Sequence, residues 1–461
     1  MATESIDKPK RWTRRLRFRL STLFLLILVI CCGLAWFHWK TKAAREQRLA
    51  VEEIHRAGGW VVYDYERNSE LTYDPLGPVW LETFLGQHFF ACVVQARIRG
   101  DVDLGIVRKL PRLDDLEVLR DRLSAADAPH LKDLTGLDSL AVYMEDATDE
   151  ELREIGQLPG LDVLMVGTPG ALDEFVLSDT RTEFRPVIRN TQVTGAGLAH
   201  LGQVGKLQQL LLRNSKISDA GLEHLRGLTD LELLDLSGTQ VTGAGLAHLK
   251  PMGNLEQLYL ARTQVTDASL AHLRDRPGLY RLDVKETQIT DAGVDHLLAM
   301  PGLSMLFLDH TAITDVGISR LKDLPNLRFL GLSGTRVTDA GMSHMREMKQ
   351  LHSLSIVRTG ITPAGLDHLN NLADLNSIEL GGPNVTDDSL QQVSRIQQLQ
   401  HLWLYDARIT DEGLLKLKSL IDLRFLLLLG DSTVTDQGIK RLKDELPLLT
   451  VSRSFPIVVD E

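Results

Sequence analysis

The stretch Thr263-Gln-Val-Thr-Asp-Ala-Ser-Leu270 recurs in varied form every 24 residues along this chain. The third position of the stretch is filled by Val193, Ile217, Val241, Val265, Ile289, Ile313, Val337, Ile361, Val385 and Ile409, and Val434 follows after one extra residue. A fixed period of this length is typical of stacked repeats, in which no unit buries its apolar face alone. The sequence therefore predicts a solenoid, and it favours a binding surface over an enzyme active site.

Two different periods alternate within each unit. Leu258 and Leu260 have the two-residue spacing of a strand, whereas Leu246, Leu249 and Met252 have the spacing of a helix face. Between strand and helix stands a Thr-x-Val/Ile-Thr/Ser tetrad. Its last residue is Thr or Ser in all eleven units, where a side-chain oxygen can cap the helix.

Two further polar columns accompany the tetrad. Aspartates follow it in the first helical turn, where negative charge is favourable, at Asp219, Asp267, Asp291, Asp315 and Asp339. Its first residue supplies a column of hydroxyls at Thr239, Thr263, Thr287, Thr311, Thr335 and Thr359. We expect these hydroxyls to bond backbone groups of adjacent coils that would otherwise lack partners.

The Leu-x-x-Leu-x-Leu frame of the strands extends upstream of the regular run. Frames begin at Leu113, Leu137 and Leu161, and Phe89/Cys92/Val94 fits the same frame one unit earlier. Between Gly167 and Arg189 the pattern degrades, and Pro186, which cannot donate to a strand ladder, predicts a local irregularity. We therefore predict a solenoid of about 14 repeats over residues 89–450, with a tail at 451–461.

The N-terminal region predicts a membrane anchor. Leu20–Trp39 contains no formally charged side chain and is long enough to cross a bilayer as one transmembrane helix. A cleaved signal peptide is the alternative, but Trp36-Phe-His-Trp-Lys40 stands where a small-residue cleavage site would be needed. The tail at residues 1–19 carries seven basic and two acidic residues. The positive-inside tendency therefore places the N-terminus in the cytoplasm and the repeats outside, in the periplasm or at the cell surface.

Residues 40–88 connect the predicted anchor to the repeats. Their first part is polar and helix-prone up to Gly58-Gly59, and Trp60-Val-Val-Tyr-Asp-Tyr65 is predicted to form a short strand. A solenoid's first unit has no neighbour on one side, so we interpret this region as a juxtamembrane helix and an N-terminal capping segment.

The consensus Leu-x-x-Leu-x-Leu-x-x-Thr-x-Val/Ile-Thr-Asp-x-Gly-Leu-x-x-Leu resembles a leucine-rich repeat. It is most similar to the 24-residue, cysteine-containing subclass of F-box-type proteins and to bacterial repeats with a Gly-Ala-Leu-Ala-like turn, as in Gly195-Ala-Gly-Leu-Ala-His-Leu201. The resemblance implies an α/β horseshoe with parallel strands on the concave face and helices on the convex face. This chain carries Thr where that subclass often carries Cys.

The layout of the chain is similar to that of membrane-anchored bacterial leucine-rich-repeat proteins, with a basic tail, one apolar segment and then the repeats. Residues 1–57 are occupied by the predicted anchor and contain no F-box-like helical module. The ubiquitin-ligase role of the F-box-type subclass is therefore not carried over.

No motif for catalysis, cofactor binding or metal binding occurs in the sequence. The formal net charge of −11 also disfavours nucleic acid as a partner. A histidine column at His130, His200, His224, His248, His272, His296, His344 and His368 could form a pH-sensitive ridge or a metal site. Lys416 and Lys440 fill the same slot in other units, so we favour a solvated surface position.

Side chains beside the strand leucines are predicted to point to the concave surface, where repeat proteins usually bind their partners. The candidate binding residues are Tyr259, Arg281, Asp283, Lys285, Phe307, Asp309, Phe329, His401, Trp403, Tyr405 and Phe425. Aromatic residues and Arg flanked by charge are typical of protein interfaces. The sequence thus predicts non-enzymatic recognition of a protein. A cell-surface glycan as ligand, or a role as structural spacer or envelope scaffold, remains the alternative.

Overall fold

The fold is described here from a computed structural model. The described residues are 20–64, 87–89, 91–120, 127–132, 134, 137–144, 147–158, 161–166, 192–202, 204, 206–430 and 433–453. Within these residues, sixteen strands form one sheet in strict sequence order.

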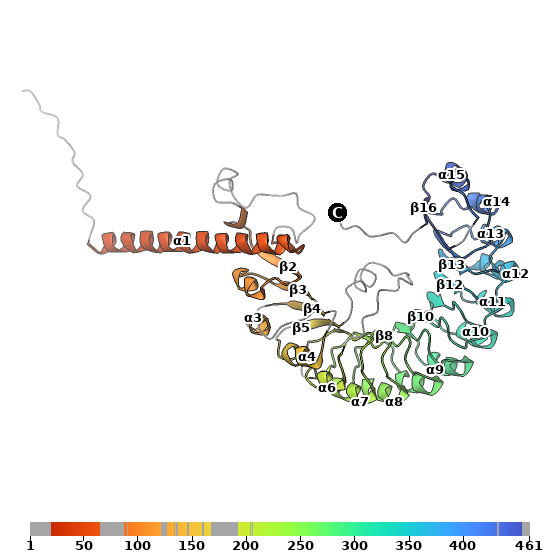
Figure 1. Cartoon of the computed structure of the whole chain (residues 1–461), viewed down its shortest axis with the longest axis horizontal. Helices are drawn as coiled ribbons and strands as arrows, with labels where there is room; N and C mark the ends of the chain where they lie inside the picture. Colours follow the sequence, from red (N-terminus) through yellow and green to blue (C-terminus); the bar gives the residue numbers. More distant parts are fainter. Residues whose placement is uncertain are drawn as a thin grey trace, which may run out of the picture.

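The elements are numbered along the chain as in Figure 1. The strands are β1 (Trp60–Tyr63), β2 (Val93–Arg99), β3 (Asp115–Arg120), β4 (Ser139–Met144), β5 (Leu161–Val166), β6 (Gln209–Leu211), β7 (Leu233–Asp235), β8 (Gln257–Tyr259), β9 (Arg281–Asp283), β10 (Met305–Phe307), β11 (Phe329–Gly331), β12 (Ser353–Val357), β13 (Ser377–Gly381), β14 (His401–Tyr405), β15 (Phe425–Leu429) and β16 (Thr450–Ser452). The α-helices are α1 (Leu20–Arg56), α3 (Ala128–Lys132), α4 (Asp149–Ile155), α6 (Gly195–Leu198), α7 (Asp219–Leu222), α8 (Gly243–Leu246), α9 (Val294–Leu297), α10 (Asp315–Leu321), α11 (Asp339–Met345), α12 (Pro363–Leu366), α13 (Asp387–Val393), α14 (Asp411–Leu415) and α15 (Asp436–Glu445). The 3-10 helices are η1 (Gln87–Phe89), η2 (Leu104–Lys109), η4 (Glu223–Gly227), η5 (Ala247–Leu249), η6 (Asp267–Leu273), η7 (Asp291–Gly293), η8 (Asp367–Asn371) and η9 (Lys416–Ser419).

The sheet and helices form a curved solenoid, as the sequence predicts. Figure 1 shows an arc with the strands on its inner side and the helices on its outer side. Strands β2 to β16 pair in parallel, and β1 adds to β2 in antiparallel orientation. Within the regular run, Leu258 lies opposite Leu282, so the pairing register equals the 24-residue sequence period.

The repeating apolar residues form one continuous core. Leu258, Leu260, Val265, Leu270 and Leu273 of a single unit are all 0% exposed. Burying a side chain of this size stabilises a fold by about 1.5–3 kcal/mol. Because each unit is covered by its two neighbours, this stabilisation depends on the stack and not on any unit alone.

The first unit departs from the predicted frame. Ala96 lies opposite Leu116 and Ile98 opposite Val118, which gives a spacing of 20 residues, not 24. The Phe89/Cys92/Val94 frame is therefore wrong, and Phe89 belongs to η1 before the strand. This unit packs against β1 and α1 where other units have a preceding repeat, so it does not have to keep the 24-residue spacing.

The predicted irregularity between Gly167 and Arg189 coincides with an interruption of the 24-residue period, although the sheet itself is continuous. Val163 of β5 lies directly opposite Gln209 of β6, so no unit intervenes between these two strands. On the convex side the same two units are also direct neighbours, because the Thr194 backbone N–H donates to Asp149 Oδ1 at 2.7 Å. Pro186 itself lies outside the described residues.

Capping of the convex helices by the last residue of the tetrad is confirmed for the threonines, whereas Ser218 makes no such bond. Thr314 Oγ1, for example, accepts a hydrogen bond from the Val316 backbone N–H at 3.2 Å. The aspartate in the first turn also has a role that the sequence did not predict. Asp291 Oδ1 and Oδ2 accept from the backbone N–H and the hydroxyl of Thr314 in the next unit, at 2.8 and 2.5 Å.

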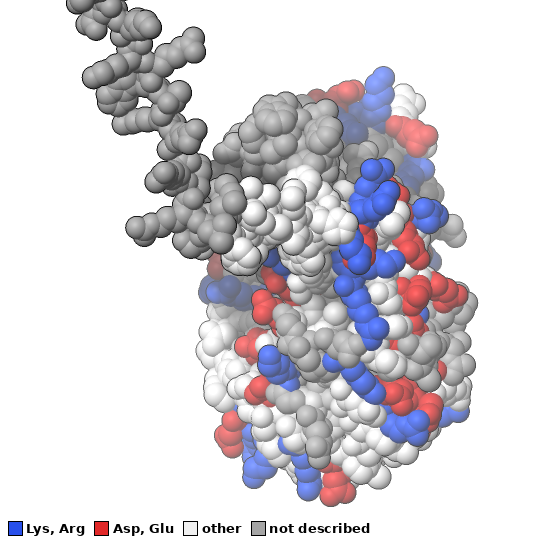
Figure 2. All heavy atoms as spheres, turned by 90° about the vertical axis from the view of Figure 1, so that its left-hand side faces the viewer, with Lys and Arg blue, Asp and Glu red and all other residues white. Residues whose placement is uncertain are grey.

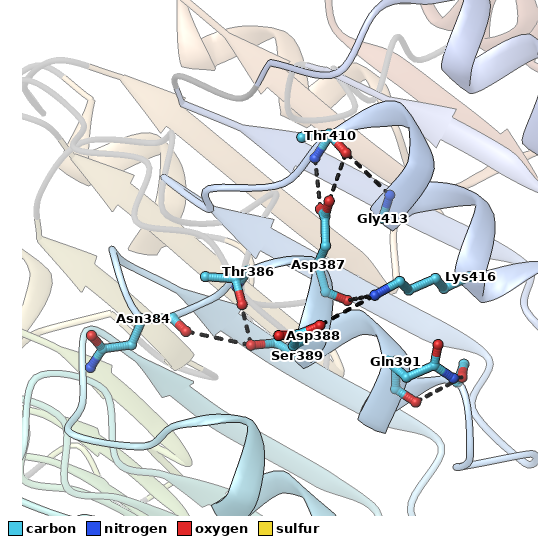
Figure 3. A network of polar contacts seen from close by, with 10 residues as sticks. Asn384, Thr386, Asp387, Asp388, Ser389, Gln391, Thr410, Gly413 and Lys416 are labelled. Atoms are coloured by element: carbon cyan, nitrogen blue, oxygen red, sulfur yellow. Dashed lines mark hydrogen bonds and ion pairs between the residues drawn. The ribbon is translucent and has the colours of Figure 1, made fainter.

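This Asp–Thr bridge repeats along the convex side. Figure 3 shows the step in which the Asp387 carboxylate accepts from Thr410 while Thr410 Oγ1 accepts from the Gly413 N–H. The bridges join Asp149 to Thr194, Asp219 to Thr242, Asp267 to Thr290, Asp291 to Thr314, Asp315 to Thr338, Asp339 to Thr362, Asp387 to Thr410, and Asp411 to Thr435. Each bridge ties one unit to the next by two hydrogen bonds.

Two units replace the bridge by a local contact. Gly243 stands in the aspartate position, and in the following unit the Thr266 N–H donates to Ser269 Oγ at 2.9 Å. Pro363 likewise precedes a unit in which Thr386 donates to Ser389. In bridged units the Ser position is Gly, as at 317, where a Cβ would lie 2.5 Å from Asp291 Oδ1. The aspartate of one unit thus requires a glycine in the next.

The second hydroxyl column bonds backbone groups, but within its own coil. Thr263 Oγ1 donates to the Leu260 carbonyl at 2.6 Å, and Thr239 and Thr287 repeat this contact. The expected bond to an adjacent coil is therefore wrong for these residues. The Thr lies three residues after the Leu whose carbonyl accepts its hydrogen bond, so its side chain closes the turn that follows the strand.

Helix α1 is continuous over 37 residues, Leu20–Arg56. Its second half packs on the start of the solenoid through Ala44, Gln47, Ala50, Val51 and Ile54. Its first half projects away from the arc in Figure 1, and the described side chains between positions 24 and 39 are exposed. Within the described part of the chain, we find no helix that combines the length and the hydropathy needed to cross a membrane.

The contact between α1 and the solenoid includes a half-buried histidine. His88 Nδ1 lies 3.3 Å from the Tyr63 hydroxyl and 3.5 Å from Gln47 Nε2. Both partners can donate a proton, so this nitrogen acts as the acceptor in a neutral ring. Burial and the nearby Arg48 accordingly lower the pKa of His88.

Candidate binding face

All eleven candidate residues belong to strands β8 to β15 or lie two residues after one of them. They alternate with core leucines such as Leu282 and Leu306, so they lie on the concave side of the sheet. The pairing register aligns Tyr259, Asp283 and Phe307 in one row across three strands. The structure gathers the candidates into two clusters, on β8 to β11 and on β14 to β15.

The first cluster is built around two cations on aromatic rings. The Arg281 guanidinium lies 5.1 Å from the Tyr259 ring centroid and 5.0 Å from that of Phe307. Lys285 Nζ lies 4.6 Å from the Phe307 centroid, and the rings of Phe307 and Phe329 are 4.7 Å apart. Contacts of this kind are stronger where water is excluded.

The charged side chains of the first cluster lie beside groups of opposite charge on the same concave face. Lys285 Nζ lies 3.8 Å from the Asp309 carboxylate, while Asp283 accepts from the Lys285 backbone N–H at 3.0 Å. Burial raises the pKa of Asp283. Desolvation opposes the charge on Lys285, but Asp309 and Asp283 outweigh it and raise the pKa of that ammonium group. The cluster therefore carries alternating charges and does not form a single-sign patch.

Several concave residues lie outside the predicted set. Arg213 pairs with Asp235 at 2.9 Å, and Asp235 is 0% exposed. Tyr143 and Leu211 pack with Tyr259 in an apolar cluster separate from the main core. These residues occupy the same alternating strand positions as the candidates. The pattern that located the candidates would therefore have found them in earlier strands.

The second cluster is aromatic. The rings of His401 and Trp403 are stacked, with centroids 5.5 Å apart and an interplanar angle of 15°, and Phe425 lies 6.0 Å from Trp403. Small hydroxyl residues separate this cluster from the first. Among them, Ser355 donates to Glu379 at 2.7 Å, and the hydroxyls of Ser333 and Ser355 are 2.8 Å apart.

The candidates differ in accessibility. Tyr259 is 2% exposed, and Phe307, Phe329, Asp309 and Trp403 are each 7% exposed. Side chains on the inside of an arc converge, so large residues there bury one another. The half-buried candidates are Arg281, Asp283, Lys285, His401, Tyr405 and Phe425. A partner would contact these half-buried residues before the buried ones.

The histidine column lies on the convex side, at the backs of the repeats. His224 and His272 are exposed, whereas His248 and His296 are half-buried. The described residues contain no group of three or more His, Cys, Asp or Glu side chains placed to hold a metal ion. A role for the column stays a prediction.

Comparison with known proteins supports the fold. Residues 277–337 match the family model described as leucine rich repeat. A search of curated proteins gives no match. Two similar solved structures are an internalin from Listeria monocytogenes and a leucine-rich-repeat protein of Leptospira interrogans.

These structural likenesses are distant. The internalin is 21% identical, with 72% of this chain and 89% of that chain covered and a TM-score of 0.46. The Leptospira protein is 16% identical, with 75% and 91% covered and a TM-score of 0.44.

The parallel ladder and the family match define the class: the solenoid is built of leucine-rich repeats, as the sequence predicts. The match is direct for residues 277–337, and the same 24-residue register holds from β6 to β15. Assignment to the cysteine-containing subclass stays a prediction.

Proposed function

We propose that this protein recognises a protein partner on the concave face of its solenoid and catalyses no reaction. Leucine-rich repeats commonly bind proteins, and stacked repeats present extended concave surfaces. The observation that carries the proposal is the arrangement of Arg281, Lys285 and the aromatic rings beside them. The leucine framework needs none of these side chains, yet they lie together on adjacent strands.

The half-buried candidates give the clearest experiment. Lys285→Ala and Tyr405→Ala remove atoms that a partner can reach, whereas Trp403→Ala or Phe307→Ala would also open a cavity and destabilise the face. Cross-linking to envelope proteins is measured for the double variant K285A/Y405A and for a matched convex control, Lys250→Ala with His224→Ala. We expect at least a tenfold loss of one cross-linked product in the concave variant only.

The opposite result has a clear meaning. Equal cross-linking by the concave variant, the convex variant and the unchanged protein would contradict recognition at this face. It would favour the alternative of a structural spacer or envelope scaffold. Competition of the same product by an isolated cell-surface polysaccharide would point to a glycan ligand instead.

We further propose that the exposed apolar end of α1 inserts into a lipid bilayer. Phe24, Leu34, Trp36 and Trp39 are each more than half exposed, although water disfavours such surfaces. Figure 2 looks along α1 from its first residues, and the spheres nearest the grey tail are white while blue and red ones mix elsewhere on this face. Flotation of the full chain with liposomes tests this proposal. Failure to float would contradict it.

The predicted orientation, with the N-terminus in the cytoplasm and the repeats outside, stays part of this proposal. The basic residues before position 20 support it. Protease treatment of intact cells and of spheroplasts should digest the repeats in at least one of the two. Protection of the repeats in both, while an external control protein is cleaved, would overturn the orientation.

A further inference from the structure

The start of the solenoid docks on α1 immediately beside the exposed apolar part of that helix. We call β1, η1, η2 and the α1 residues from Ala44 onward the N-terminal cap. Among the described side chains of α1, Ala44 is the first that is buried, and it lies only five positions after the exposed Trp39. The contact begins even earlier, because the rings of Phe37 and Phe89 are 5.8 Å apart and Lys40 Nζ lies 6.0 Å from the Phe89 ring centroid.

The continuity of α1 fixes the height of this cap above the apolar segment. A helix rises about 1.5 Å per residue, so Ala44 lies roughly 7.5 Å beyond Trp39 along the axis. The interfacial layer of a bilayer is about 5–8 Å thick on each side, and Trp prefers its inner edge. With Trp39 at that edge, Phe89 and Lys40 fall within the layer of headgroups.

We infer that the N-terminal cap rests directly on lipid headgroups, with η1 facing the bilayer, so that the solenoid stands on the membrane surface. This inference rests on the proposed insertion of α1. Charge complementarity supports it. Lys42 and Arg48 pair with Glu46 and Glu52 along α1, whereas none of the ion pairs of the described residues engages Lys40 or Arg45. These two cations are available to lipid phosphates at the level of the cap.

Tryptophan quenching by brominated lipids tests the inference. Three full-length variants each keep one tryptophan and replace the others by Phe: one keeps Trp36, one keeps Trp60, and one carries Phe89→Trp. Each is reconstituted in liposomes of phosphatidylcholine and phosphatidylglycerol whose acyl chains are brominated near the headgroup. Trp60 follows the far end of α1 and serves as the distal control.

We expect strong quenching of the tryptophans at 36 and 89 and less than a tenth as much at 60. Quenching at 36 without quenching at 89 would overturn the inference and leave lipid insertion intact. No quenching at 36 would instead overturn the insertion itself, and the inference with it.

A second probe avoids any change in the packed cap. Glu46 is exposed, so a fluorophore on Glu46→Cys, with Cys31 and Cys32 replaced by Ser, leaves Lys40, Arg45, Phe89 and the buried Cys92 unchanged. A blue shift and quenching by headgroup-labelled lipid support contact with the bilayer surface. A spectrum identical to that of the same fluorophore on Lys418→Cys, at the opposite end of the arc, would contradict it.

Discussion

At the scale of single residues, His88 makes the fold sensitive to pH. Its Nδ1 faces the hydroxyl of Tyr63 and the amide of Gln47, while Arg48, Glu52 and His55 are the charged or titratable groups around it. Burial, then Arg48, holds the pKa of His88 below its ordinary value of 6.5. The unfolded chain therefore binds this proton more readily, and stability is lost as the pH falls below about 6.5.

The variant His88→Gln tests this prediction, because a Gln oxygen can accept the same hydrogen bonds without titrating. We expect the Tm of the unchanged protein to fall more than that of H88Q between pH 7.5 and pH 5. Substitution of the exposed His224 by Gln is the control and should follow the unchanged protein. Parallel Tm curves for all three proteins would show that His88 has no part in the pH response.

At the scale of the repeat element, the bridge between units obeys a pairing rule. A Cβ at position 245 would lie 2.3 Å from Asp219 Oδ1, so Gly245→Ser should destabilise the fold by about 1–3 kcal/mol through overpacking. Adding Asp219→Gly creates the Gly–Ser arrangement found naturally at Gly243 and Ser269. We therefore expect a favourable coupling energy of about 0.5–3 kcal/mol in urea unfolding. Strictly additive effects would refute the rule.

The same element shows how far the sequence predicts the structure. The spacing of Leu258 and Leu260 is enough to place a strand, and the hydroxyl of Thr314 to place a helix start, because both depend on local geometry. The bond from Asp291 to the next unit was not predictable in this way, since it joins residues on neighbouring coils. The near-complete burial of Trp403 was missed for a similar reason, because it follows from the curvature of the whole sheet.

At the scale of the whole molecule, the solenoid behaves as a sum of units and neighbour contacts. Deleting residues 289–312 removes one 24-residue unit, including β10, and joins equivalent positions of its two neighbours. Strand β9 can then pair with β11 in the register that each now has with β10. We expect this deletion to keep the circular dichroism spectrum and one cooperative unfolding transition. A matched deletion of residues 289–308, shorter by four positions, should lose both. Folding of the two proteins to the same extent would contradict a fixed 24-residue register.

The direct pairing of β5 with β6 has a practical consequence for this molecule. The described residues end at Val166 and resume at Gln192, and the strands on either side of this segment are immediate neighbours. Val166 lies opposite Met144, and the Gln192 backbone N–H donates to the Ala147 carbonyl at 3.1 Å, so both flanks of the segment lie against one short stretch of chain and are close enough to accept a guest. A fluorescent protein whose termini are close together could be spliced in at this point. The host would then report its own location in a living cell without a tag at either terminus.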